Sequence, residues 1–155
     1  MIETCQELRN GIVSIKPFEN ESDFDYLYRL AIEEKDNLLD LDEIKKLILE
    51  YGILFWNVWV KEEKIGVIFI YKVKGSYFLE GLKDKYATTK ALLYSIRAGE
   101  LALKYLSGLT NEVFTCTRIS NKAVVRLCER LNFINKGKVN SIFGEMYLFR
   151  RLICQ

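Results

Sequence analysis

Apolar residues in the first third of the chain recur at helical spacing. Phe24, Leu27, Tyr28 and Ala31 lie at positions i, i+3, i+4 and i+7, so one helical face is apolar. The segment from Ser22 to Asp25 just before them has the form of a capping box. These residues predict a first helix with one buried face.

A second helix is predicted to start at Asp40, with Glu43 as its capping-box partner. Its expected inner stripe is Leu41, Ile44, Ile48 and Tyr51. Gly52 follows directly and is expected to end the helix in the left-handed conformation.

Several runs are rich in β-branched and aromatic residues. One precedes Pro17, and three more cover 53–60, 65–73 and 77–82, separated by polar turns at 61–64 and 74–76. The three later runs predict an antiparallel meander. Trp56 and Trp59 are three residues apart and therefore face opposite sides of the strand. We expect one in the core and the other at the rim; the alternative is that they form a wall of the acceptor pocket.

The second half of the chain alternates helices and strands. A helix with two apolar sides is predicted over 88–106, a strand over 112–117, and a helix from Ser120 or Asn121 to a left-handed Asn132. Strands over 133–139 and 145–152 close the chain as a hairpin. The order β-α-α-β-β-β-α-β-α-β-β predicts a single α/β (α+β) domain over 1–155. We expect a mixed sheet of about seven strands flanked by four helices.

Composition excludes several classes of protein. The net charge is +2 and acidic and basic residues are interleaved, which disfavours a nucleic-acid partner. The longest apolar stretch, 52–60, is interrupted by Asn57 and is too short for a membrane span. The N-terminus lacks a signal-peptide pattern, so we expect a cytoplasmic protein.

The chain contains no histidine, which removes Ser-His-Asp and Cys-His catalysis and histidine-ligated metal sites. Its four cysteines form no C-x-x-C pair, and no metal site is expected. Free thiols are the simpler interpretation. A disulfide between Cys5 and Cys154 is the alternative that the sequence leaves.

The order of elements resembles that of the general N-acetyltransferase (GNAT) superfamily. The segment 121–133, NKAVVRLCERLNF, is similar to the family pattern N-x-x-A-x-x-L-Y-E-K-x-G-F. Asn121, Leu127, Glu129 and Phe133 match that pattern outright. The resemblance implies acyl transfer from acetyl-CoA to an amine of a small molecule or a protein, and a homodimer is compatible with it.

Cys128 stands where the family usually has a tyrosine that protonates the departing thiolate. A thiol, with a reference pKa of ~8.5, could donate a proton instead, although it is shorter than tyrosine. The alternative is that Cys128 is a small buried hydrophobe on the inner face of its helix. Tyr86, Tyr94 and Tyr147 are further candidate donors, or core and rim aromatics.

A glycine loop of pattern R/Q-x-x-G-x-G/A holds the pyrophosphate in the family, and 84–89 aligns with it as DKYATT. Both glycines are replaced, and Asp84 takes the place of the Arg or Gln. The stretch is either a phosphate site built on helix amides and hydroxyls or a plain helix N-terminus with threonine caps. The resemblance gives these cofactor-binding residues: Leu79, Gly81, Leu82, Lys85, Tyr86, Ala87, Thr88, Thr89, Lys90 and Asn121.

Glu80 lies on the strand where such enzymes often place a general base. An amine must lose a proton before it attacks a thioester, and a carboxylate with a raised pKa suits that step. The alternative is an exposed strand residue paired with a lysine. Acidic residues of the first two helices either attract a cationic amine or form a solvated face; they are Glu33, Glu34, Asp36, Asp40, Asp42 and Glu43.

Two functions therefore follow from the sequence. One is an N-acyltransferase with Glu80 as base and Cys128 as candidate acid. The other is a non-catalytic GNAT-fold module for structure or protein interaction, because the glycine loop is replaced. Its resemblance to GNAT-like proteins with such loops is compatible with a phage-encoded origin.

Overall fold

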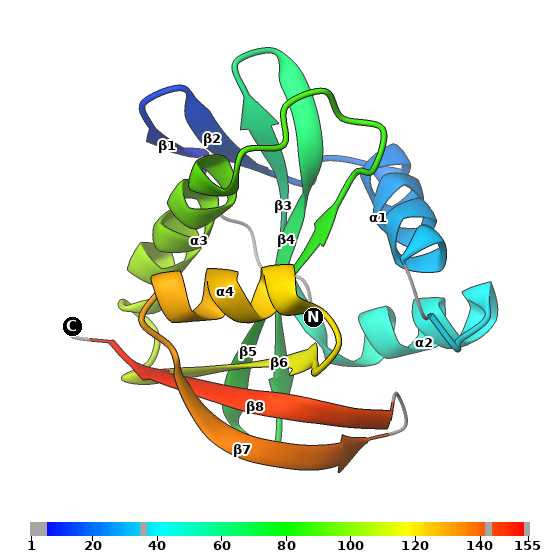
Figure 1. Ribbon diagram of the computed structural model, residues 1–155. Helices are drawn as coiled ribbons and strands as arrows, with labels where there is room; N and C mark the ends of the chain where they lie inside the picture. The colour runs from blue at the N-terminus through cyan, green and yellow to red at the C-terminus, as the bar shows by residue number, and fades with distance from the viewer. Residues whose placement is uncertain (1–5, 35–36, 142–143, 154–155) are drawn as a thin grey trace.

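The computed structural model describes residues 6–34, 37–141 and 144–153. Within these residues, eight strands form one sheet in the order β1-β2-β3-β4-β5-β6-β8-β7 (Figure 1). The strands are β1 (Leu8–Asn10), β2 (Val13–Pro17), β3 (Gly52–Val60), β4 (Glu63–Val73), β5 (Ser76–Lys83), β6 (Glu112–Arg118), β7 (Ile134–Ser141) and β8 (Gly144–Leu152). The helices are α1 (Glu21–Glu33), α2 (Leu41–Tyr51), α3 (Leu92–Leu106) and α4 (Lys122–Arg130). The predicted order of elements is confirmed, with β1 as an extra strand.

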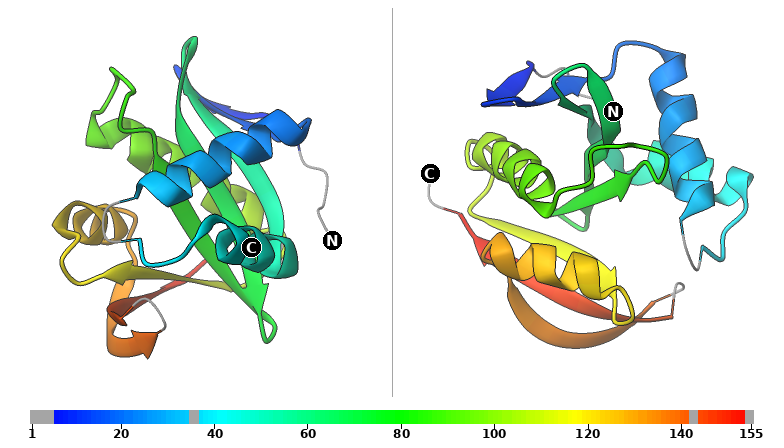
Figure 2. Two further views of the ribbon diagram at one scale, coloured as in Figure 1. Left: turned by 90° about the vertical axis from the view of Figure 1, so that its right-hand side faces the viewer. Right: turned by 45° about the horizontal axis from the view of Figure 1, so that its top comes forward.

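The four helices cover the sheet in pairs, α1 and α2 on one face and α3 and α4 on the other (Figures 1 and 2). Each pair of helices packs over a separate cluster of buried apolar residues. The larger cluster lies beneath α3 and α4 and includes the fully buried Trp56, Leu106 and Phe149. The smaller one lies beneath α1 and α2 and includes Leu27, Phe55 and Leu82.

The start of α1 differs from the prediction. The helix begins at Glu21, and the N-cap is Asn20, whose side chain accepts a hydrogen bond from the Ser22 amide at 3.1 Å. Asp23 then reaches back to the Glu19 amide at 2.8 Å. The cap therefore lies two residues before Ser22, because asparagine is as good a cap as serine.

The capping box of α2 is confirmed. Asp40 accepts from the Glu43 amide at 2.9 Å, and the Glu43 carboxylate accepts from the Asp40 amide at 3.4 Å. Ile44 and Ile48 are buried, whereas Leu41 at the start of the stripe is exposed. Gly52 is extended, with φ −69° and ψ 137°, and so begins β3 instead of forming a left-handed terminator.

The meander is confirmed by continuous antiparallel pairing of β3 with β4 and of β4 with β5. Trp56 is fully buried in the core. Trp59 is partly exposed, with the Lys16 Nζ 5.0 Å and the Lys64 Nζ 5.7 Å from its ring centroid. The two tryptophans therefore occupy core and rim, as their spacing predicts.

The long helix starts later than predicted. α3 begins at Leu92, so Thr88 and Thr89 belong to the loop after β5 and do not cap a helix. Ala87 in this loop is buried in the larger core cluster. Burial of Ala87 holds the loop against the core instead of letting it wind into a helical turn.

The C-terminal elements follow the prediction closely. Asn121 caps α4 by accepting from the Val124 amide at 3.2 Å, and Asn132 ends it with φ 62°. β7 and β8 pair as a hairpin in which Ser141 lies opposite Gly144. The suggested Cys5–Cys154 bridge lies outside the described residues.

The sheet opens between its two halves. β5 and β6 run parallel and share a single register pair, Phe78 with Phe114, within the described chain. Beyond Phe78 the two strands diverge, and the segment from Leu79 to Lys83 faces the gap. The divergence of β5 and β6 can be followed in the ribbon (Figure 2).

Candidate active site

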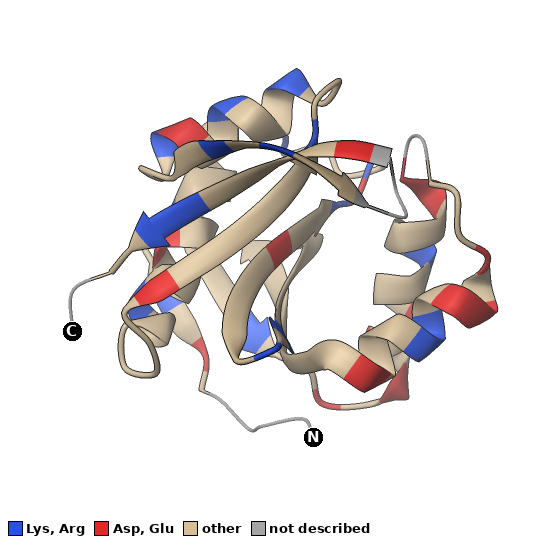
Figure 3. Cartoon of the chain, turned by 90° about the horizontal axis from the view of Figure 1, so that it is seen from below, with Lys and Arg blue, Asp and Glu red and all other residues tan. Residues whose placement is uncertain are grey.

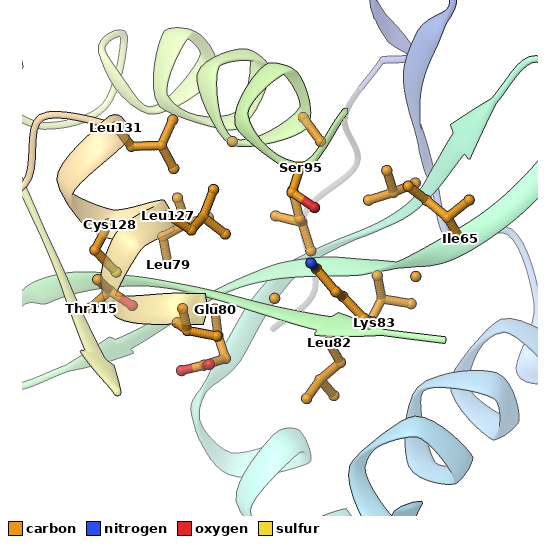
Figure 4. Close-up of a pocket in the computed structure, with 18 of the residues that line it drawn as sticks. Ile65, Leu79, Glu80, Leu82, Lys83, Ser95, Thr115, Leu127, Cys128 and Leu131 are labelled. Atoms are coloured by element: carbon orange, nitrogen blue, oxygen red, sulfur yellow. The ribbon is translucent and has the colours of Figure 1, made fainter. Parts of the chain in front are cut away.

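A first cavity lies on the α3 and α4 side of the diverging strands and has a volume of about 120 Å³. Figure 4 shows Ser95 of α3 and Lys83 of β5 pointing toward one another, with Leu127 and Cys128 of α4 across the cleft. Most of its wall is apolar. A narrow apolar cleft of this kind suits an extended, mainly aliphatic arm.

A second cavity of about 280 Å³ lies on the α1 and α2 side. Residues Glu80, Gly81, Leu82 and Val124 line both cavities. The two cavities therefore adjoin one another along the C-terminal half of β5, where two reactants entering from opposite sides would come together.

Glu80 stands at this junction. It lies opposite Phe69 in the β4–β5 register, and its i+2 neighbour Leu82 packs beneath α1 and α2, so Glu80 shares the face of the second cavity. Burial raises the pKa of its carboxyl to about 8, nearby Glu34 adds to the rise, and a hydrogen bond from the Gly81 backbone opposes it. The ion pairs of the described residues leave Glu80 without a lysine partner, in contrast to the exposed, paired alternative.

The residues near Glu80 on this face include acidic, basic and neutral titratable side chains. Burial raises the pKa of Glu34, at the C-terminal end of α1, and the charge of Arg118 counteracts that rise. Burial, with a smaller contribution from Glu80, also raises the pKa of Tyr71 above its usual value and that of Cys116 to about 11. Tyr71 and Cys116 were not predicted as site residues from the sequence. The signal that could have found them is the alternation of side chains between the two faces of the sheet along β4 and β6.

Cys128 is buried and lines the first cavity. Burial, with smaller effects of Glu80 and Glu129, raises the pKa of its thiol to about 12. The thiol is therefore protonated at neutral pH and holds its proton firmly. Its place in the cleft is compatible with both predicted roles, so its role as proton donor stays a prediction.

The loop after β5 binds a carboxylate of the protein itself, an interaction that was not predicted from the sequence. The Glu63 carboxylate at the start of β4 accepts from the Thr88 amide at 2.8 Å, the Thr88 hydroxyl at 2.9 Å and the Thr89 amide at 3.0 Å. Hydrogen bonds from Thr89 and Thr88 lower the pKa of Glu63 to about 2. In the sequence, Glu63 is indistinguishable from the other charges of a polar turn.

Asp84 ties the same loop to α1. Its carboxylate accepts from the Tyr26 hydroxyl at 3.0 Å, pairs with Arg29 at 3.1 Å and accepts from the Tyr86 amide at 3.0 Å. Burial acts to raise the pKa of Asp84, but these hydrogen bonds outweigh it and hold the pKa below its usual value. The acid that replaces the family's Arg or Gln thus has a structural role.

The other predicted binding residues are dispersed. Leu79, Gly81 and Leu82 line the first cavity and Asn121 lines the second, and their role in cofactor binding stays a prediction. Lys85 pairs with Glu33 at 3.5 Å, and Tyr86 is 70% exposed. Lys90 is exposed on the loop. The structure therefore brings the β5 residues together at the junction and leaves the loop lysines at the surface.

No helix among the described residues is long and apolar enough to cross a membrane. The same part of the chain holds no group of three or more potential metal ligands. Seen from below, acidic and basic residues are interspersed (Figure 3).

Comparison by sequence finds neither a matching protein-family model nor a matching curated protein. Comparison of structures gives clear matches. A GNAT-family acetyltransferase from Bacillus anthracis aligns with a TM-score of 0.72 at 15% identity over 95% of this chain and 98% of that one. A mutant spermidine N-acetyltransferase from Vibrio cholerae aligns with a TM-score of 0.71 at 14% identity, over 92% and 95% of the two chains.

A third similar structure is an acetyltransferase from Salmonella typhimurium that modifies the N-terminal serine of a ribosomal protein. Its TM-score is 0.69 at 14% identity, over 93% of this chain and 96% of that one. The chain thus has the GNAT fold, and the resemblance expected from the sequence is confirmed at the level of the fold.

Proposed function

We propose that the protein is an N-acyltransferase that moves an acetyl group from coenzyme A to an amine. The observation that carries the proposal is Glu80, a carboxylate of raised pKa at the point where two cavities meet between diverging strands. The GNAT fold supports it, because this arrangement is what transfer between two substrates requires.

Glu80 has the properties of the base for this reaction. At neutral pH an alkylamine is protonated and cannot attack a carbonyl carbon. With a pKa of about 8, Glu80 is mostly protonated at pH 7, and its ionised form, which grows as the pH rises, is a much better proton acceptor than an ordinary glutamate. In the transfer the ammonium gives one proton to Glu80, the nitrogen bonds to the carbonyl carbon, and the C–S bond breaks. The nitrogen loses a second proton and the departing thiolate takes one up, so the products are the amide, the free thiol and protonated Glu80.

The residues present suit coenzyme A in two places. The first cavity is an apolar cleft beside β5, whose edge beyond Phe78 does not pair with β6, so its backbone groups can polarise a thioester carbonyl. The amides of Thr88 and Thr89 bind an anion, since they already hold a carboxylate. A pyrophosphate would bind there after displacing Glu63, and Lys83 and Lys90 lie close by along the chain.

One observation favours the alternative of a non-catalytic module. Glu63 fills the loop amides that a pyrophosphate would need, and an internal carboxylate of this kind stabilises the loop without any ligand. The two functions differ in whether acetyl-CoA binds, which a direct titration decides.

The test of the proposed function is Glu80→Gln. Thiol release from acetyl-CoA is measured with a panel of amines. We expect the variant to lose at least about tenfold in kcat/KM, because a general base typically contributes ~10²–10⁴-fold. Glu100→Gln, an exposed position on α3, is the matched control and is expected to leave the rate unchanged. Equal rates for wild type and Glu80→Gln would exclude Glu80 from the mechanism.

A further inference from the structure

The second cavity has a wall made mainly of apolar side chains. α2 contributes Ile44, Leu47 and Ile48, β4 contributes Phe69, Tyr71 and Val73, and other elements add Leu39, Leu82 and Met146. An apolar wall attracts an apolar ligand and disfavours charge.

The aromatic part of this wall is fixed by ring contacts. The ring centroids of Phe69 and Tyr71 are 6.0 Å apart, and Tyr71 stacks on Phe78 at 5.1 Å. Phe69 stacks in turn on the buried Phe55 at 5.9 Å. The wall is therefore a preformed surface rather than a set of loose side chains, and it can select ligands by shape and polarity.

Charges in the cavity are few. Among the described lining residues the carboxylates are Glu34 and Glu80, and Arg118 is the cation. Arg118 acts on Glu34 and partly neutralises it. Glu80 is therefore the carboxyl left for a ligand ammonium, whose charge favours the ionised form of Glu80. A second ammonium would have to lie against apolar side chains, which is unfavourable.

We propose that the acceptor is a small primary amine with a single positive charge and an apolar body, rather than a polyamine. This inference rests on the proposed function, because it names the substrate of the same site. The amine lies at Glu80 and the body lies along α2 and β4. The volume of about 280 Å³ falls just below the usual range for ligand pockets, which fits a small molecule.

Two matched amines test the proposal. Hexylamine and hexamethylenediamine share one six-carbon chain and differ by a second ammonium. With acetyl-CoA as donor, we expect kcat/KM for hexylamine to exceed that for the diamine by at least about tenfold, because the second charge meets an apolar wall. Equal values, or a preference for the diamine, would overturn the proposal while leaving acyl transfer intact.

A pair of variants locates the selectivity. Leu47 lines the cavity, whereas Leu49 on the same helix is 65% exposed and lies outside that wall. Leu47→Glu supplies a partner for a second ammonium, so it should shift the ratio of kcat/KM toward the diamine, and Leu49→Glu should not. Thermal unfolding of both variants checks that they fold. If Leu47→Glu does not fold, Val73→Glu at the end of β4 makes the same test.

Binding of the amines alone separates this inference from the proposed function. Calorimetry without acetyl-CoA is expected to show that wild type binds hexylamine more tightly than the diamine, and that Leu47→Glu reverses the order. That result without any acetyl transfer would refute the enzyme and keep the apolar amine site. Acetyl transfer to other amines with no preference for hexylamine in binding or turnover would refute the amine site alone.

Discussion

Replacing Glu80 by glutamine should stabilise the protein increasingly as the pH rises. The carboxyl has a pKa of about 8 in the folded protein against an ordinary value of 4.5, so the fold favours its protonated form. Its contribution to stability is complete below pH ~4.5, declines as pH rises between ~4.5 and ~8, and is then fully lost. Glutamine cannot ionise and has no such loss.

The size of the effect follows from the shift. A change from 4.5 to about 8 is worth at most about 5 kcal/mol, and solvent at the partly exposed carboxylate lessens that value. Domains of this size are stable by roughly 5–15 kcal/mol, so even half of the effect would be easy to measure.

Urea unfolding of wild type and Glu80→Gln at pH values near 5, 7 and 9 measures this difference. We expect a small gap in unfolding free energy near pH 5 and a gap of several kcal/mol in favour of the variant near pH 9. Glu100→Gln, at an exposed position, is the control and should show no trend. A gap for Glu80→Gln that stays constant across this range would show that the Glu80 pKa is not raised.

Three other substitutions test separate parts of the structure. Glu63→Ala frees the loop amides and should tighten acetyl-CoA binding. The control Glu62→Ala, on the exposed turn, should leave binding unchanged. Weaker or unchanged binding in Glu63→Ala would mean that Glu63 only orders the loop. Gly66→Ala places a Cβ against the backbone oxygen of Leu82, and we expect a loss of about 2 kcal/mol in urea unfolding; a loss below ~0.5 kcal/mol would contradict this. Asp40→Ala removes the N-cap of α2 and should cost about 1 kcal/mol in the same assay, and no change would mean that water replaces the cap.

The features that the sequence predicted well are those fixed by neighbouring residues. The capping box of Asp40 and Glu43 and the left-handed Asn132 depend on contacts within one helical turn, so local spacing suffices to find them. The order of the elements is likewise readable from local periodicity. Gly52 is an exception, because pairing with β4 extends its backbone.

The loop after β5 was beyond sequence reasoning because distant residues determine it. Glu63, 25 residues before Thr88, holds the loop amides, and Ala87 is buried in the core. Glu80 could be proposed from its strand, but its raised pKa depends on burial and on Glu34 in another element. The properties of Glu80 therefore arise from the fold, although the residue itself could be proposed from the sequence.

Calorimetric titration with acetyl-CoA tests the central claim most directly. A cleft beside the open strand β5, with anion-binding amides at the following loop, predicts saturable binding with a Kd below about 100 μM, which corresponds to roughly 5.5 kcal/mol. The absence of both binding heat and a thermal shift at millimolar acetyl-CoA would contradict the account and leave a GNAT-fold protein that does not act on coenzyme A.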